Sequence, residues 1–251
     1  MSRILVLAAL GRNPVSGAAR PNRNDLLALE LARELGGELS VLHAGKGEDD
    51  ALRDYLAHGA PALDILPLAE GQDVAQALAG AAAGYDLILA GTRAEGGEGS
   101  GMVPYLLAEQ LGLPIVDQAL EVTIADGHAS ITQGLAKGQR RHVRVALPAV
   151  VVVHPNAART PRYAFAHRAA GTLHHHPAAA TAPAEVSPWR TERAGKRPIR
   201  FKAAETKAGH ARMLSAIVTE ARGGAVIASG TPAEKAQAIL AYLRDRKLID
   251  W

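Results

Sequence analysis

Two kinds of hydrophobic pattern alternate along the first 114 residues of the chain. Short continuous apolar runs are typical of strands buried on both faces of a sheet, and apolar residues at helical spacing are typical of amphipathic helices. The pattern predicts strands at residues 4–10, 39–44, 62–66 and 87–90, and helices at 24–35, 48–58, 72–83 and 102–111. This alternation indicates an α/β fold with a mainly parallel sheet flanked by helices, and a polar loop at 11–21.

The period of the pattern changes after Pro114, where short alternating or β-branched runs are separated by Asp-Gly and Lys-Gly turn signals. The runs lie at 118–124, 129–135, 142–146 and 149–153. Such runs predict antiparallel hairpins, and we expect these strands to extend one edge of the parallel sheet.

The last third of the chain shows little apolar periodicity. Residues 155–200 are rich in Pro, Ala, His and Arg, which predicts an extended arm. A helix at 212–222, a short strand at 225–228 and a terminal helix with a capping box at Thr231 are predicted beyond it. The terminal helix has an apolar face formed by Ala236, Ile239, Leu240 and Leu243. A helix of this kind needs another surface to dock against.

The composition removes several classes of site. The 251 residues permit one or two domains, and 48% of them are hydrophobic. The absence of cysteine excludes disulfides, iron–sulfur clusters, thiolate zinc sites and cysteine nucleophiles. The apolar stretch at the start is too short to span a membrane and continues into the α/β pattern, so we expect a cytoplasmic protein.

Basic residues gather after Arg159, although the formal net charge is only +3. Aromatic residues make up 4% of the chain and do not interleave with these cations, which favours an acidic protein partner over nucleic acid. The run His174, His175 and His176 invites a metal-site interpretation. Neighbouring side chains in an extended chain point to opposite sides, so a solvated linker is the favoured interpretation.

The stretch from Asp86 to Pro114 combines an apolar run, a glycine-rich loop and a helix. In a parallel sheet such a loop lies at the carboxyl edge, where backbone N–H groups and a helix N-terminus face an anion, most naturally a nucleotide phosphate. A plain flexible connection is the alternative. The loop matches neither the Walker pattern nor the nucleophile elbow, because Glu98 replaces the first glycine around Ser100.

Three segments, at residues 22–30, 86–114 and 147–163, together resemble the beta subunit of electron transfer flavoproteins. Residues 22–30 are similar to the segment Asn-Pro-Phe-Asp-Glu-x-Ala-x-Glu of that family. Residues 86–91, followed by 107–114, resemble its nucleotide loop and the helix after it. Residues 147–153, followed by 160–163, resemble its Leu-Pro-Ala-Val strand and Pro-Arg-Tyr signature. The resemblance covers residues 3–165.

The resemblance implies a heterodimer of the adenine-nucleotide alpha-hydrolase-like fold. An alpha subunit would hold most of an FAD, and this chain would bind AMP or a second FAD. Electrons would pass from a flavin dehydrogenase toward the quinone pool of the respiratory chain. No side chain would be catalytic, because the flavin performs the redox chemistry. A non-redox nucleotide-binding regulatory or stress-type protein of the same topology is the alternative.

The resemblance and the pattern of the last third together divide the chain into three parts: a nucleotide-binding α/β domain at 1–155, an extended arm with a partner loop at 156–208, and a C-terminal helical segment at 209–251 that is expected to dock on the partner subunit. Asn22 would present its amide to an adenine or ribose, although such a residue is equally suited to capping a helix. The other expected cofactor-binding residues are Leu7, Ala8, Ala44, Gly96, Gly97, Gly99, Ser100, Gly101, Met102 and Val103.

The chain departs from the family pattern at several places. Arg23 and Asn24 replace the Pro and Phe of the family, and the Gln of its phosphate loop is absent. After Tyr163 the segment that recognises the dehydrogenase is replaced by residues 164–171, in which Phe165 is the only large apolar anchor. We therefore expect a different or dedicated redox partner.

Overall fold

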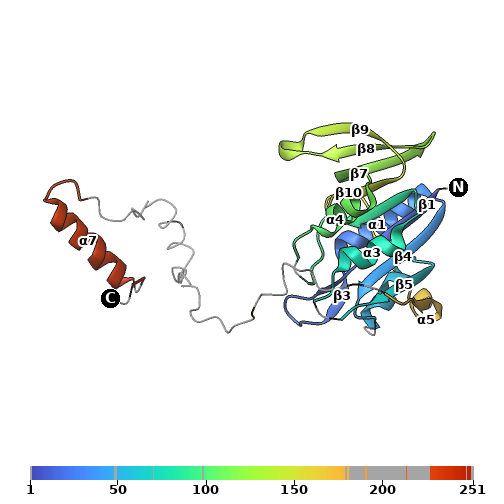
Figure 1. The fold of residues 1–251 in the computed structure, drawn as a ribbon, viewed down its shortest axis with the longest axis horizontal. Coiled ribbons are helices and arrows are strands. Elements are labelled where there is room, and N and C mark those ends of the chain that lie inside the picture. The colour runs from blue at the N-terminus through green and yellow to red at the C-terminus, as the bar shows by residue number, and fades with distance from the viewer. Residues whose placement is uncertain are drawn as a thin grey trace. The chain divides into compact units, whose positions relative to one another are not determined.

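The computed structural model describes residues 2–47, 50–69, 71–97, 99–178, 180, 190, 213, 227–246 and 248–249. The chain divides into two compact units, Met1–Thr191 and Glu192–Trp251. The first unit is an α/β domain, and the second contains one described helix (Figure 1). The three parts expected from the sequence remain a prediction.

A nine-stranded sheet forms the first unit, in the order β11-β5-β4-β1-β6-β10-β7-β8-β9. The seven strands from β11 to β7 are parallel, and β8 and β9 continue the sheet as antiparallel strands. The bounds are β1 (Arg3–Ala8), β4 (Glu38–Gly45), β5 (Ala62–Pro67), β6 (Leu87–Gly91), β7 (Ile115–Ala125), β8 (His128–Gly134), β9 (Arg140–Ala146), β10 (Ala149–Val153) and β11 (Thr172–His175).

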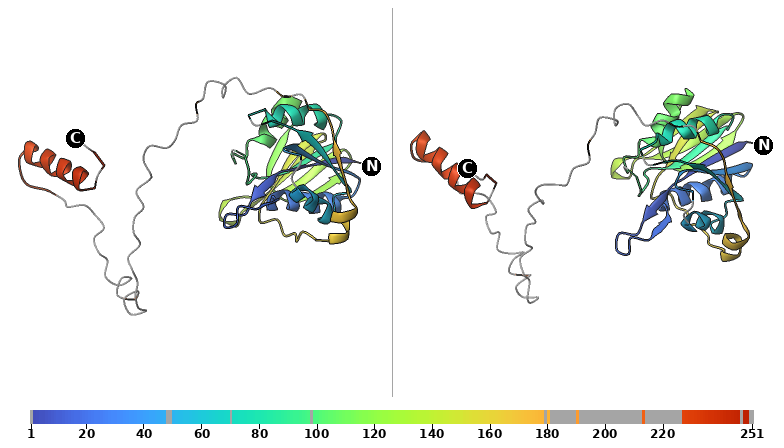
Figure 2. Two further views of the ribbon diagram at one scale, coloured as in Figure 1. Left: turned by 90° about the horizontal axis from the view of Figure 1, so that it is seen from below. Right: turned by 60° about the horizontal axis from the view of Figure 1, so that its bottom comes forward.

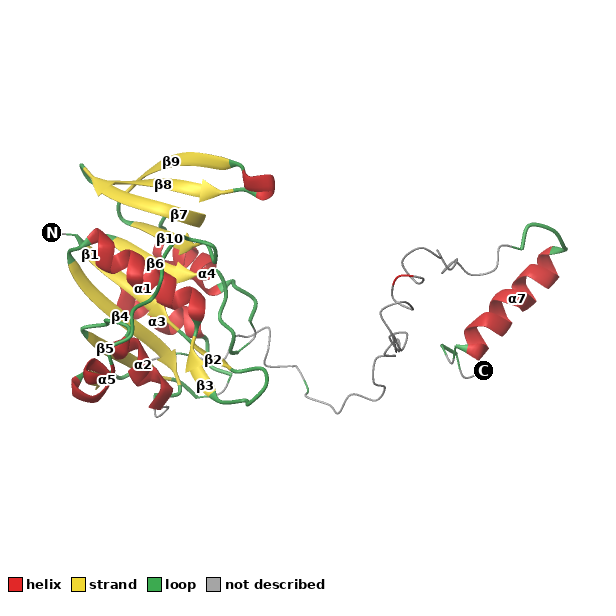
Figure 3. Cartoon of the chain, turned by 180° about the vertical axis from the view of Figure 1, so that it is seen from behind, coloured by secondary structure: helices red, strands yellow, loops and turns green. Residues whose placement is uncertain are grey.

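Helices cover both faces of this sheet (Figures 2 and 3). Their bounds are α1 (Arg23–Leu35), α2 (Arg53–Ala57), α3 (Val74–Ala82), α4 (Val103–Leu111) and α5 (Phe165–Ala170), with 3-10 turns η1 (Asp50–Leu52) and η2 (Ala136–Gly138). Side chains of β1 alternate between two cores, because successive residues of a strand point to opposite faces. Ile4 and Val6 pack with α1 and α2, and Leu5 and Leu7 pack with α3 and α4. The predicted α/β fold is confirmed.

Strand β10 corrects one prediction. Residues 149–153 were expected in an antiparallel hairpin, but β10 lies inside the sheet and is parallel to both β6 and β7. All five of its residues are buried. An uninterrupted apolar run without polar alternation is the pattern of a parallel strand covered on both faces, which explains the position. The hairpins formed by β7, β8 and β9 agree with the prediction.

Two segments expected to lack regular structure contain short elements. The loop at 11–21 includes an antiparallel pair, β2 (Leu10–Arg12) and β3 (Ala19–Pro21). The extended arm expected from residue 155 is wrong for residues 165–175, which form α5 and β11. Ion pairs from Arg168 to Asp50 and Asp54 hold α5 against α2, and β11 completes the edge of the sheet beside β5.

The second unit contains α7 (Pro232–Asp245), which begins at the predicted capping box. The Thr231 hydroxyl accepts a hydrogen bond from the Glu234 N–H, and the Glu234 carboxylate accepts one from the Thr231 N–H. None of the helix's described residues is buried. The predicted helix at 212–222 and strand at 225–228 lie almost entirely outside the described residues. Within the described ranges, no helix is long and apolar enough to cross a membrane.

Candidate functional site

The candidate site lies where the strand order of the parallel sheet reverses. From β1 the chain passes through α1 to β4 on one side, and from β6 it passes through α4 to β7 on the other. The carboxyl ends of β1 and β6 therefore border a topological switch point, which is the usual ligand position in open α/β sheets. The N-terminus of α1, the β2–β3 hairpin and the glycine loop after β6 meet there.

Asp25, in the first turn of α1, joins the ends of the two strands. Its carboxylate accepts hydrogen bonds from the N–H of Ala9, at 2.8 Å, and of Gly91, at 3.2 Å. Burial raises the pKa of Asp25 to about 7, although the hydrogen bonds from Ala9, Asn22, Gly91 and Tyr55 act in the opposite direction. A carboxyl group with this pKa changes its protonation state near neutrality.

Tyr55 of α2 extends the same buried cluster. Its hydroxyl donates to the Ala9 carbonyl at 2.6 Å, accepts from the Asn22 N–H at 3.1 Å and lies 3.4 Å from the Asp25 carboxylate. Burial, followed by the negative charge of Asp25, raises the pKa of Tyr55 well above its ordinary value. Sequence reasoning did not assign Asp25 or Tyr55 to the site. The acid three residues after Asn22 was visible in the sequence, but its partners come from other strands and helices.

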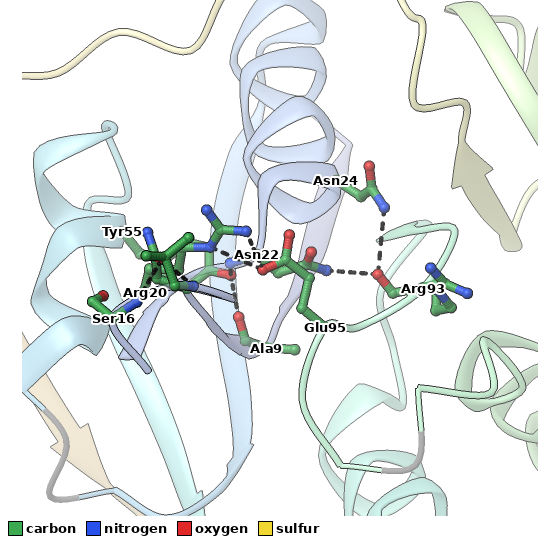
Figure 4. Close-up of polar contacts among 10 residues, drawn as sticks. Ala9, Ser16, Arg20, Asn22, Asn24, Tyr55, Arg93 and Glu95 are labelled. Atoms are coloured by element: carbon green, nitrogen blue, oxygen red, sulfur yellow. Dashed lines mark hydrogen bonds and ion pairs between the residues drawn. The ribbon is translucent and has the colours of Figure 1, made fainter. Parts of the chain in front are cut away.

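Asn22 is fully buried at the N-cap position of α1. Its amide nitrogen donates to the Arg93 carbonyl at 2.9 Å, which ties the start of the glycine loop to the helix (Figure 4). Its Oδ1 atom is buried and has no hydrogen-bond partner among the described residues. A buried acceptor without a donor is costly, so this oxygen is suited to receive a hydrogen bond from a ligand.

The glycine loop turns through left-handed backbone conformations. Gly97, Gly99 and Gly101 have φ values of 61°, 60° and 74°. A Cβ at Gly101 would lie 2.7 Å from the Thr92 carbonyl, so glycine is required there on two grounds. The Ser100 hydroxyl accepts from the Met102 N–H at 3.3 Å, and its own proton remains able to donate. Successive N–H groups in such turns can form a concave anion-binding nest.

The β2–β3 hairpin closes over the first half of this loop. Arg20 contacts the Glu95 carboxylate through Nε at 3.0 Å and through its terminal nitrogen at 2.9 Å (Figure 4). The backbones also meet, because a Cβ at Gly96 would collide with the Leu10 carbonyl, and the Glu95 side chain lies so close to Gly11 that a Cβ there would collide with it. The loop is thus packed against the hairpin and is not merely a flexible connection.

The other residues predicted to bind a cofactor lie on strands β1 and β4 and at the start of helix α4. The side chains of Leu7 and Ala8 are buried in the two cores at the end of β1, and Ala44 at the end of β4 packs on the core beside α3. The Ala8 carbonyl is 2.9 Å from His43 Nδ1. Met102 and Val103 are the N-cap and first residue of α4. The structure brings Asn22 against Arg93 at the start of the loop, whereas Ala44 belongs to the next strand outward.

Two other features lie away from this site. A groove of about 580 Å³ on the α3 side is lined by residues such as Leu42, Tyr85 and His176 and by none of the predicted cofactor-binding residues. His174 and His176 lie 3.4 and 2.8 Å from Asp64 Oδ1 at the edge of the sheet, so the expected linker is wrong for these two residues, although their side chains are half exposed to solvent as expected. Within the described part of the chain, no group of three or more acidic or histidine residues could hold a metal ion.

Comparison with known proteins gives two agreeing results. A model of the electron transfer flavoprotein domain matches residues 15–188. The electron transfer flavoprotein subunit beta of Chromohalobacter salexigens is 39% identical over an alignment of 255 positions, which covers 98% of this chain and 95% of that protein. The chain belongs to the electron transfer flavoprotein family. Family membership confirms the resemblance carried by the segments at 22–30, 86–114 and 147–163.

Membership in the electron transfer flavoprotein family has three general consequences. It implies association with a flavin, an alpha-subunit partner, and a role as an electron carrier rather than as a classical enzyme. These consequences agree with a site that has a buried carboxyl group and a buried amide oxygen without a hydrogen-bond partner among the described residues, but is built mainly from backbone and glycine.

Proposed function

We propose that the chain is the beta subunit of a heterodimeric electron transfer flavoprotein. It passes electrons from a flavin dehydrogenase toward the respiratory chain through an FAD that it shares with an alpha subunit. The observation that carries this proposal is the similarity to a beta subunit over 98% of the chain, which includes the segment beyond residue 191. A self-contained nucleotide-binding regulator has no evident use for that segment.

We further propose that AMP occupies the switch point between β1 and β6. Asn22 Oδ1 has the chemistry to accept from the adenine amino group or a ribose hydroxyl, and the N–H groups around Gly97, Gly99 and Gly101 and the Ser100 hydroxyl are suited to a phosphate. A second FAD is the competing occupant. Nothing in the geometry demands a second flavin, so AMP is the simpler proposal.

The FAD supplies the electron-transfer chemistry when it is bound. The residues of this chain bind and position. The apolar face of α7, which includes Ile239 and Leu240 and has no buried residue among those described, is proposed to dock on the alpha subunit. Tyr163 and Phe165, which are 55% and 65% exposed, are proposed to contact a dehydrogenase particular to this protein. Exposed aromatic anchors are common at such interfaces.

Co-expression with the alpha-type chain tests the proposal. We expect a yellow heterodimer whose denatured supernatant releases FAD and AMP in about equal amounts. Two FAD molecules per heterodimer would identify a second flavin in place of AMP. A colourless homodimer that binds AMP or ATP alone would support the non-redox alternative and overturn the electron-carrier proposal.

A further inference from the structure

The ion pair between Arg20 and Glu95 is unusual because it places a carboxylate beside a loop that is suited to bind an anion. Glu95 belongs to the loop itself, two residues before the first left-handed glycine, Gly97. Its carboxylate makes two contacts of about 3 Å with the Arg20 guanidinium. Without that cation, the negative charge of Glu95 would repel a phosphate approaching the loop.

The ion pair is not the only contact between the hairpin and the loop. The backbone of Gly96 also lies against the Leu10 carbonyl, so the two segments are closely packed beside the ion pair. The side chains of Arg20 and Glu95 remain 44% and 32% exposed. Ion pairs with this degree of exposure contribute little to stability and exchange readily.

Both guanidinium contacts are with one oxygen, Glu95 Oε2, and the same two nitrogens could contact a phosphate oxygen in its place. The two asparagines at the start of α1 fix the beginning of the loop, since Asn22 and Asn24 both donate to the Arg93 carbonyl. Arg20, held by the Glu95 carboxylate, lies beside the loop, near the buried Asn22 whose Oδ1 lacks a donor among the described residues (Figure 4).

We propose that Glu95 is an internal substitute for a phosphate group. It holds Arg20 in the position from which that guanidinium binds the phosphate of a nucleoside monophosphate, and the entering phosphate displaces the Glu95 carboxylate. Arg20 is then a specificity residue that distinguishes a nucleotide from a nucleoside. This inference rests on the proposed nucleotide site and does not depend on the electron-carrier role.

The test uses the nucleotide-depleted heterodimer and isothermal titration with AMP and with adenosine, which lacks the phosphate. Arg20→Ala is expected to weaken AMP binding by about tenfold or more, because a charge-assisted hydrogen-bonded pair is lost. Glu95→Gln is expected to strengthen AMP binding by about two- to fivefold, because a competing exposed ion pair is removed. The affinity for adenosine should stay unchanged in both variants.

Arg12→Ala is the matched control. Arg12 lies on the same hairpin, and its guanidinium donates to the Gly17 carbonyl within that hairpin. Its removal should change neither affinity. Arg20→Lys should restore part of the AMP affinity, because it keeps the charge but not the two-nitrogen geometry.

Three outcomes would overturn the inference. Equal losses of AMP and adenosine affinity in Arg20→Ala would show that Arg20 only supports the hairpin. Weaker AMP binding by Glu95→Gln would show that Glu95 assists the ligand. Failure of both the wild type and Glu95→Gln to bind AMP would contradict the proposed nucleotide site. The FAD content and heterodimer formation of the same samples report separately on the proposed function.

Discussion

Helices α1 and α7 have similar lengths, 13 and 14 residues, but opposite surroundings. Eight residues of α1 are buried against the sheet, whereas none of the described residues of α7 is buried. Both helices are amphipathic by sequence. The pattern therefore predicts that a helix forms, but it does not say which surface will cover its apolar face.

The acidic residues in the first turns of the two helices show the same difference. Burial raises the pKa of Asp25 in α1 to about 7. Hydrogen bonds with Thr231 lower the pKa of Glu234 in α7, which is exposed. One acid is part of the sheet's internal structure, and the other supports only its own helix. The described contacts of helix α7 are thus local ones, such as its capping box.

The largest expected effect separates the two apolar faces. Leu29→Ala in α1 should lower the free energy of unfolding by about 2–5 kcal/mol, because Leu29 is fully buried and the truncation leaves a cavity. Leu240→Ala in α7 should change that free energy by less than about 0.5 kcal/mol in the isolated chain. Urea denaturation, followed by a spectroscopic signal from the first unit, measures both free energies. Similar losses in the two variants would contradict the comparison.

The second prediction uses the titration of Asp25. A folded-state pKa of about 7, against an ordinary value of 3.8, means that the folded state binds the proton more tightly than the unfolded state. The contribution of this group to stability is therefore full below pH 4 and falls as the pH rises toward 7. Relative to Asp25→Asn, the wild type should lose about 2 kcal/mol between pH 4.5 and 6.5. Denaturation curves across this range give the difference, and parallel profiles would show that Asp25 does not titrate there.

Much of the fold was predictable because its signals are local. The strand, glycine loop and helix at 86–114, the hairpins after Pro114 and the capping box at Thr231 are encoded by neighbouring residues. The position of β10 inside the parallel sheet was not predicted, because an apolar run of five residues does not indicate which strands lie on either side of it. Strand β11 was missed because its histidines lack a β-type pattern, and its place depends on pairing with β5 and contact with Asp64.

The site was predictable only in part for a related reason. Asn22 and the glycine loop could be identified from motifs, and the structure places them in contact through Arg93. The junction of Asp25 with Ala9 and Gly91, and the pair formed by Arg20 and Glu95, join residues 16 to 75 positions apart. No local spacing connects such residues, so only the folded topology reveals them.

The third prediction concerns the proposed partner of α7. Leu240→Asp should weaken the heterodimer by about tenfold or more, because a charge would enter an apolar interface. The unfolding free energy of the first unit should stay the same in the isolated chain, since no described residue of α7 is buried. Surface plasmon resonance with the alpha subunit measures the affinity.

Ala241→Asp is the matched control for this interface. It adds the same carboxylate one residue further along the helix, where the side chain points away from the apolar face that contains Leu240. The affinity for the alpha subunit should therefore stay within about twofold of the wild type. An equal loss in both variants would show that an added charge, or a weakened helix, and not the apolar face, controls the association.

The smallest expected effect lies in the cap of α7. Thr231→Ala removes the hydroxyl that accepts from the Glu234 N–H and should destabilise the helix by about 1 kcal/mol. Hydrogen exchange of the amides at 234–236 in the isolated full-length chain should accelerate by about fivefold, since the Glu234 N–H is bound by the Thr231 hydroxyl and the next amides are bound only within the first turn of the helix. Thr231→Ser, which keeps the hydroxyl, should exchange at the wild-type rate. In the heterodimer the effect should shrink, because contacts with the alpha subunit would then hold the helix in place of its cap. An equal acceleration in the isolated chain and in the heterodimer would mean that the alpha subunit does not stabilise α7. The difference from α1 would then be that no other surface packs against α7.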